Sequence, residues 1–238
     1  MTEEQEQQEQ APVGGVITKI ERQARSKQRY NVFLDGLFAF SVHEDLMVKF
    51  RLLKGASIEP GEYEHILIEE ERHRGYSSAL RLLSSRLRSE YEIRERLKRK
   101  EFEAEVIDHV AARLKNEGYL NDEMFAEMLT KQRSESHKKG RHWIKQELQQ
   151  KGIPKEHITN ALEQVDEAVE VEAAYQLASK RYRKDWEEDR LKARRKIAGF
   201  LQRRGYSGNV VSKVMAKMPA ASGDEDWHEF PEQSDFDE

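Results

Sequence analysis

The sequence contains no cysteine, and this absence excludes several classes of protein at once. Without a thiol, the chain can form no disulfide, bind no zinc through thiolates and carry out no thiol redox chemistry. It also lacks a run of the roughly 20 apolar residues that a membrane-spanning helix needs. Its first residues, Met-Thr-Glu-Glu-Gln-Glu, lack the basic and apolar segments of a signal peptide. We therefore expect a cytoplasmic protein with no membrane partner.

Motifs of catalysis and ligand binding are also absent. The sequence has no Gly-x-x-x-x-Gly-Lys-Ser/Thr loop, no Gly-x-Gly-x-x-Gly after a strand and no His-Glu-x-x-His. The closest two histidines, His137 and His142, are five positions apart across Gly140, a poor spacing for one metal on one helix face. The acidic run Glu69-Glu70-Glu71 is typical of a solvated helix surface. We predict a protein that is not an enzyme, with no catalytic residue, no cofactor and no metal.

Charge is plentiful but unevenly distributed. Residues 1–15 contain four acids and residues 219–238 contain eight, and neither segment contains Lys or Arg. Without those twelve acids, 33 of the 45 Asp and Glu remain against 41 Lys and Arg, so the body carries +8 although the net charge is −4. A basic body favours a polyanionic partner or an acidic protein groove. We expect 1–14 to be a disordered acidic leader and 219–238 a disordered acidic tail.

Alternating β-branched and aromatic residues predict a small antiparallel meander over 15–44. Asp35-Gly36 separates two of its strands and is typical of a two-residue hairpin turn. A helical connector is expected over 45–76, with a short helix at 45–53 followed by the breakers Gly55 and Pro60-Gly61. Every later apolar pattern has helical spacing.

One helical pattern occurs three times after the connector. An aliphatic pair four residues apart precedes a basic or polar turn, and a new apolar series follows. The pairs are Ile93/Leu97, Ile144/Leu148 and Ile197/Leu201, with separations of 51 and 53 residues. An amphipathic helix precedes each pair, so each repeat has three helices: repeat 1 at 77–120, repeat 2 at 121–167 and repeat 3 at 168–218. A tetratricopeptide array, with two helices in about 34 residues, fits this period poorly.

The predicted fold is therefore mainly α, with three tandem three-helix repeats after a small N-terminal antiparallel β meander. With 36% charged and 37% apolar residues, the chain has little material for one large core. Small units stacked end to end tolerate that composition, so we expect an elongated curved rod.

Basic residues concentrate on the middle helix of each repeat and could form a stripe that binds a partner. Long basic side chains also simply cover and solubilise amphipathic helices. We interpret Tyr182 and Trp186 as possible stacking residues, and Trp143 as a core residue. The candidate stripe comprises Arg94, Lys98, Lys138, Lys139, Arg141, Lys145, Arg190, Arg194, Arg195, Arg203 and Arg204.

Several segments resemble the RecX family of bacterial recombinase regulators. They are Gly118-Tyr119-Leu120-Asn121-Asp122, the run 139–148 closing on Lys151-Gly152-Ile153, and the three tandem helix triplets, together covering about 77–218. The strand-containing leader is similar to the extended N-terminus of members from Gram-positive bacteria.

This resemblance implies a negative regulator that binds RecA in the groove of the RecA–DNA filament. Such a regulator modulates ATP hydrolysis, filament growth and strand exchange in homologous recombination, DNA repair and the SOS response. The resemblance implies a monomer and leaves contact with single- or double-stranded DNA open. The alternative hypothesis is a stand-alone nucleic-acid-binding helical-repeat protein, since 190–204 contains no acid.

Overall fold

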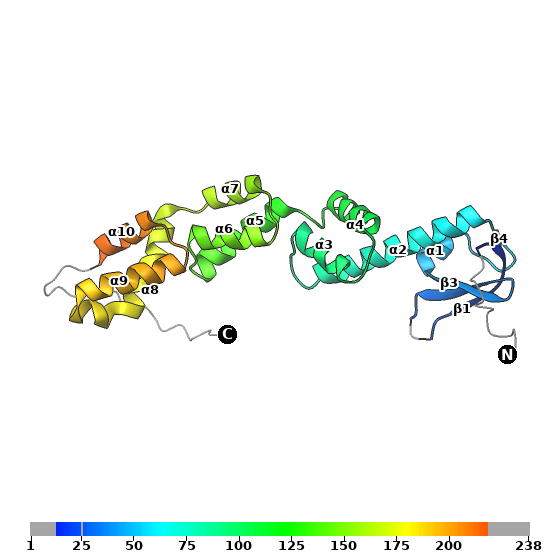
Figure 1. Cartoon of the computed structure of the whole chain (residues 1–238), viewed down its shortest axis with the longest axis horizontal. Coiled ribbons are helices and arrows are strands. Elements are labelled where there is room, and N and C mark those ends of the chain that lie inside the picture. The colour runs from blue at the N-terminus through cyan, green and yellow to red at the C-terminus, as the bar shows by residue number, and fades with distance from the viewer. Residues whose placement is uncertain (1–12, 25, 219–238) are drawn as a thin grey trace, which may run out of the picture. The chain divides into compact units, whose positions relative to one another are not determined.

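The computed structural model of the protein describes residues 13–24 and 26–218 (Figure 1). The chain forms two compact units. The first comprises the described residues up to Leu129 together with Glu147–Ala161, and the second comprises Thr130–Gln146 together with the described residues from Leu162. Most of the predicted acidic leader and the whole predicted acidic tail, with Trp227, Phe230 and Phe236, lie outside the described residues. None of the described helices is long and apolar enough to cross a membrane.

The first unit begins with the predicted antiparallel sheet. Its strands are β1 (Gly15–Arg22), β2 (Arg29–Leu34), β3 (Leu37–His43) and β4 (Ser57–Ile58), in the order β3-β2-β1-β4. Asp35 and Gly36 both have positive φ, at 46° and 91°, as the predicted two-residue hairpin requires. The predicted meander is confirmed. Strand β4 was not predicted, because two residues are too few to show an alternating pattern.

Helices α1 (Glu44–Lys49) and α2 (Pro60–Leu83) follow the sheet. The short helix ends earlier than predicted, because Arg51 takes a φ of 51° and the N–H of Leu52 turns back to the carbonyl of Met47. Figure 1 shows α2 running from the sheet to α3 and α4. The predicted boundary between 76 and 77 therefore falls inside one continuous helix.

The sheet and the N-terminal half of α2 enclose one core. Ile17, Val32 and Leu34 from the sheet and Ile66 from α2 are fully buried. Glu70 of α2 is also buried, and its carboxylate lies 2.6 Å from Arg29 of β2 and accepts the N–H of His43. The prediction that Glu69-Glu70-Glu71 is a solvated run is therefore wrong for Glu70. The guanidinium of Arg29 compensates the charge of this buried carboxylate.

The three predicted helix triplets are confirmed. Repeat 1 contains the end of α2 with α3 (Glu90–Lys98) and α4 (Ala104–Asn116). Repeat 2 contains α5 (Asp122–Lys131), α6 (Arg141–Gln150) and α7 (Lys155–Glu163), with a π-helical segment, Gln132–Ser136, after α5. Repeat 3 contains α8 (Glu167–Glu188), α9 (Arg190–Arg203) and α10 (Gly208–Lys217). Both residues of all three predicted aliphatic pairs are fully buried.

The recurring turn after each pair is a helix C-cap of the Schellman type. The residue after the basic position has a positive φ in every repeat: 63° at Glu101, 71° at Gly152 and 89° at Gly205. The next N–H returns to the carbonyl of the second aliphatic residue of the pair, at 3.1–3.3 Å. The repeat detected in the sequence is thus largely the signature of one capping motif.

The corner between repeats 1 and 2 also has the predicted caps. Gly118 has a φ of 77°, and the N–H of Tyr119 donates to the carbonyl of Leu114. Asn121 accepts the N–H of Met124 and so caps α5, while Asp122 accepts the N–H of Glu90 at 2.9 Å. Burial raises the pKa of the Asp122 carboxyl.

The Schellman turns also contact the start of the preceding middle helix. The hydroxyl of Ser89, which caps α3, donates to the carbonyl of Lys151 at 2.7 Å. At the equivalent place in the second unit, the N–H of Gly140 donates to the carbonyl of Arg204 at 3.0 Å. Equivalent residues are therefore joined at both junctions, through a side-chain hydroxyl in one case and a backbone N–H in the other.

Candidate functional site

The candidate basic residues divide into two groups according to their contacts. The first group is engaged within the chain. Arg94 pairs with Glu90 at 2.7 Å and with Asp108 at 2.5 Å. Arg141 lies 3.1 Å from the buried Glu170 and also donates to the carbonyl of Val165. These two arginines stabilise the repeats and have less of their charge to offer a partner.

Four further candidates are engaged by polar groups or aromatic rings. Lys138 donates to Gln176 at 2.8 Å, and Arg204 donates to the carbonyl of His137 at 3.2 Å. The ammonium of Lys139 lies 4.3 Å from the centroid of the Trp143 ring, and the guanidinium of Arg190 lies 5.7 Å from that of Trp186. Trp143 is half-buried, so the prediction of a core role holds only in part.

The second group is exposed. Among the residues that the structure describes, no side-chain hydrogen bond or ion pair engages its members, which are Lys98, Lys145, Arg194, Arg195 and Arg203. A free exposed cation has no internal interaction to lose when it meets an anion. This group therefore retains the charge that a partner-binding surface needs.

Three exposed cations share one face of α9, which we call the α9 cationic face: Lys192, Arg195 and Arg203. They are spaced at i, i+3 and i+11 and lie opposite the buried Ile197 and Leu201. Gly199 lies between Arg195 and Arg203 on the same face, and the Arg203 guanidinium lies over it, with Nη1 3.2 Å from the place of a Cβ. Sequence reasoning listed Arg195 and Arg203 but missed Lys192 as part of this face.

Two positions are basic in all three repeats: Arg88, Lys139 and Lys192 near the start of the middle helix, and Lys100, Lys151 and Arg204 at its end. The positions equivalent to Arg195 are His142 in repeat 2 and Tyr91 in repeat 1. The recurring position at the end of the middle helix lies at the helix C-cap, where Lys151 pairs with Glu92 at 3.1 Å. That position supports the helix ends, as cations near a helix C-terminus do.

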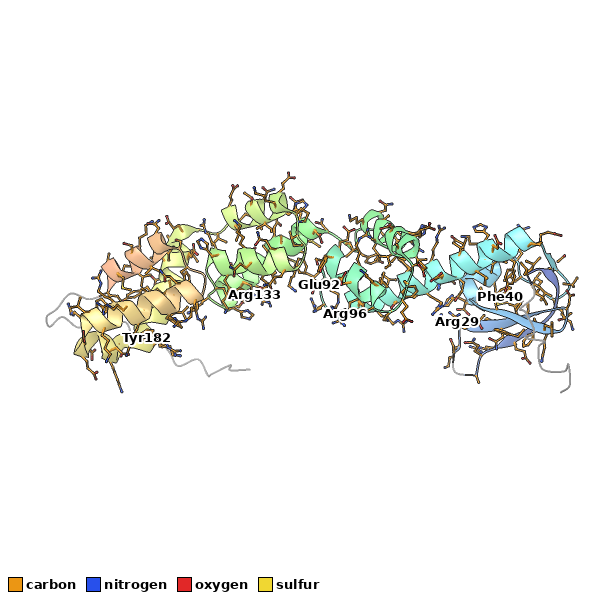
Figure 2. All side chains as sticks on the ribbon, viewed as in Figure 1. Arg29, Phe40, Glu92, Arg96, Arg133 and Tyr182 are labelled. Carbon is orange, nitrogen blue, oxygen red and sulfur yellow. The ribbon has the colours of Figure 1, made fainter. Side chains whose placement is uncertain are left out.

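The proposed stacking pair is contradicted for Trp186. Its side chain is only 4% exposed and belongs to the core of repeat 3, so no base can reach its ring. Tyr182 is half-buried and packs edge-on against Phe200, with ring centroids 5.6 Å apart (Figure 2). It also marks a kink in α8, where φ is −119°. Both aromatic residues therefore serve packing within repeat 3.

A small histidine cluster lies at the junction of β3, α1 and α2. Ligand atoms of His43, Asp45 and His73 lie within 4.8 Å of one another, a grouping that the scattered histidines of the sequence did not suggest. The Nδ1 of His43 already accepts the N–H of Asp45 and so caps α1, while the Nε2 of His73 lies 3.4 Å from the Asp45 carboxylate. Burial and the neighbouring His43 lower the pKa of His73. The cluster thus caps α1 through His43 and brings His73 close to the Asp45 carboxylate.

Four family models match the chain in sequence order. The regulatory protein RecX N-terminal domain matches residues 15–59, and the first three-helix domain of RecX matches 76–114. The second and third three-helix domains of RecX match 121–162 and 168–215. Each of the last three models coincides with one helix triplet.

Curated relatives named regulatory protein RecX cover most of the chain. The protein of Listeria welshimeri is 35% identical over 195 residues, which are 82% of this chain and 72% of that protein. The protein of Clostridioides difficile strain 630 is 33% identical over 204 residues, covering 86% of this chain and 96% of that protein.

Solved structures agree with these matches. A crystal structure of regulatory protein RecX is 30% identical, covers 85% of this chain and 99% of its own, and superimposes with a TM-score of 0.70. The RecX structure from Lactobacillus salivarius, at 24% identity and a TM-score of 0.59, shares the fold over 62% of this chain. The chain therefore belongs to the RecX family of regulatory proteins.

Proposed function

We propose that this protein is a negative regulator of the RecA recombinase that binds the groove of the RecA–DNA filament without catalysing a reaction. In this proposal it acts in the cytoplasm, as a monomer, in homologous recombination, DNA repair and the SOS response. Binding limits the ATP hydrolysis, growth and strand exchange of the filament. Membership of the RecX family supports a regulatory role connected with RecA.

The observation that carries the docking part of the proposal is the α9 cationic face. Arg195 and Arg203 are exposed and unpaired within the described part of the chain. Acidic side chains in a filament groove can reach two guanidinium groups at such a surface. Each charge-assisted hydrogen bond to Arg contributes more than a neutral one.

The test measures the DNA-dependent ATP hydrolysis of RecA during titration with the intact protein. We expect inhibition by the unaltered protein and at least a tenfold higher half-inhibiting concentration for the double variant Arg195→Glu, Arg203→Glu. The matched control is Lys180→Glu, Lys184→Glu, which changes the charge equally at exposed positions of α8. No inhibition and no binding by the unaltered protein over the full titration would contradict the proposal.

The alternative, a stand-alone nucleic-acid-binding protein, uses the same free cations against phosphates. It predicts tight, salt-dependent binding to DNA in the absence of RecA. If the Arg195/Arg203 variant keeps its DNA affinity but loses inhibition of RecA, the protein-contact proposal is favoured. Equal loss of both activities favours the alternative.

A further inference from the structure

A cleft of about 960 Å³ opens in the first unit. Its walls come from β2 and β3 of the sheet, from one face of α2 and from the turn between α3 and α4. We call it the α2 cleft. Arginine, lysine, histidine, serine and glutamine side chains dominate its lining, and none of the lining residues is Asp or Glu.

One face of α2 supplies the floor of the cleft. Arg74, Ser77, Ser78 and Arg81 are spaced at i, i+3, i+4 and i+7, which places them on a single helix face. Arg74 and Arg81 are exposed, and they lie about 10 Å apart along the helix axis at 1.5 Å per residue. The face therefore presents two cations separated by more than the width of one phosphate group.

Lys100 and Phe102 approach this face from the α3–α4 turn. The ammonium of Lys100 donates to the hydroxyl of the buried Ser78 at 2.6 Å. The guanidinium of Arg74 lies 5.9 Å from the centroid of the Phe102 ring. The Schellman turn that ends α3 thus fixes a third cation and a half-buried aromatic ring at the cleft.

In this part of the chain, carboxylates pair with other cations but not with Arg74, Arg81 or Lys100. Arg29, on the opposite wall, lies 2.6 Å from Glu70, and Glu69 pairs with Lys49 and Arg72. No carboxylate of the described residues pairs with Arg74, Arg81 or Lys100. Like charges gathered around one cleft repel each other, and a bound anion removes that repulsion.

The chemistry of the lining identifies the class of anion. One guanidinium group can donate two hydrogen bonds to the oxygens of a phosphate group, and serine hydroxyls are further hydrogen-bond donors. Cations about 10 Å apart match a chain of phosphates better than a single one, and an aromatic ring beside them offers a surface for a base. Stacking on such a ring requires an unpaired base, which favours a single strand over a duplex.

We infer that the α2 cleft binds a short segment of single-stranded nucleic acid, with Arg74, Arg81 and Lys100 on its phosphates and Phe102 against a base. The inference does not rest on the proposed regulation of RecA. It uses residues of the first unit, whereas the α9 cationic face belongs to the second.

The test is fluorescence anisotropy of a labelled oligothymidylate with the full chain and no RecA, over a range of salt concentrations. We expect Arg74→Gln, Arg81→Gln to weaken binding at least tenfold at low salt. The slope of log K against log salt should fall by about 1.4, or about 0.7 for each lost contact with a single strand. Circular dichroism and thermal unfolding establish that the variant is folded.

The matched control is Lys54→Gln, Lys155→Gln, which removes two exposed cations of the same unit that do not line the cleft. An equal loss in this control would overturn the assignment, as would unchanged binding by the Arg74/Arg81 variant. Tighter binding of a duplex of the same length, or equal competition by polyglutamate or ATP, would also overturn it.

A second readout locates the base. An oligonucleotide containing 5-iododeoxyuridine should form a photo-cross-link to the peptide that contains Phe102, detected by mass spectrometry. The cross-link should disappear in Phe102→Leu, while the anisotropy of that variant changes only a few-fold. A cross-link confined to other peptides contradicts the proposed position of the base.

Discussion

At the scale of single residues, two buried glutamates show how this chain uses charge inside its units. Glu70 accepts hydrogen bonds from β3 and pairs with Arg29, and Glu170 accepts the N–H of Arg141 at 3.0 Å and pairs with its side chain. In both cases one carboxylate joins a helix to a neighbouring element. Breaking such a pair leaves a buried charge uncompensated, which commonly costs about 3–5 kcal/mol.

The lowered pKa of His73 makes a prediction about pH. Burial and His43 disfavour its protonated form, and Glu70 and Asp45 oppose this effect only in part. The unfolded chain, with His near its ordinary pKa of about 6.5, therefore binds a proton more readily than the folded chain. The resulting stabilisation of the folded chain is complete above a pH of about 6.5, and it is lost as pH falls through the lowered pKa of His73.

Urea denaturation between pH 5 and pH 8 measures this effect. We expect the free energy of unfolding of the unaltered protein to fall more steeply below pH 6.5 than that of His73→Asn. Replacing the exposed His65 of α2, which lies outside the histidine cluster, with Asn serves as the control. Parallel pH profiles for the unaltered protein and His73→Asn would contradict the prediction.

At the scale of elements, the Schellman turns explain why the repeat is recognisable in the sequence. They also explain how repeat 1 differs from the other two repeats. Gly152 and Gly205 occupy left-handed positions, and Glu101 occupies the equivalent position in repeat 1. A residue other than glycine in that conformation costs about 1–2 kcal/mol. The Schellman turn of repeat 1 therefore carries backbone strain that the equivalent turns of the other two repeats avoid.

We predict opposite effects for two substitutions at these equivalent turns. Glu101→Gly should stabilise the first unit by about 0.5–1 kcal/mol, since relief of strain exceeds the added entropy of the unfolded chain. Gly205→Ala should destabilise the second unit by more than about 2 kcal/mol, because the new Cβ would lie 2.3 Å from the backbone nitrogen of Trp143. Denaturation followed by circular dichroism measures both changes, and a destabilised Glu101→Gly would contradict the strain argument.

The same elements show what the sequence could and could not reveal. Local sequence patterns were sufficient to predict the hairpin at Asp35-Gly36 and the buried pairs such as Ile93 and Leu97. Turn type and helical periodicity depend on residues that are close together in the sequence. Burial of Trp186 depends on how α8 packs against α9 and α10, which no local pattern records. The α2 cleft escaped notice for a similar reason, since Lys100 follows Arg81 only after a complete helix.

At the scale of the whole molecule, a basic body lies between two acidic ends. The tail at 219–238 contains eight acids and no Lys or Arg, so its removal changes the net charge from −4 to +4. Negative charge tethered to a basic body competes with nucleic acid for its free cations and repels phosphates at long range. Both effects weaken with salt.

We predict that a chain ending at Met218 binds a single-stranded oligonucleotide about 3–10-fold more tightly than the full chain at low salt, with the difference shrinking as salt rises. Anisotropy titrations at several salt concentrations measure both quantities. A full-length variant with the tail's acids replaced by Asn and Gln separates charge from chain length, and it should match the shortened chain. If that variant instead binds like the unaltered protein while the shortened chain binds more tightly, the tail obstructs its partners through its bulk and not through its charge.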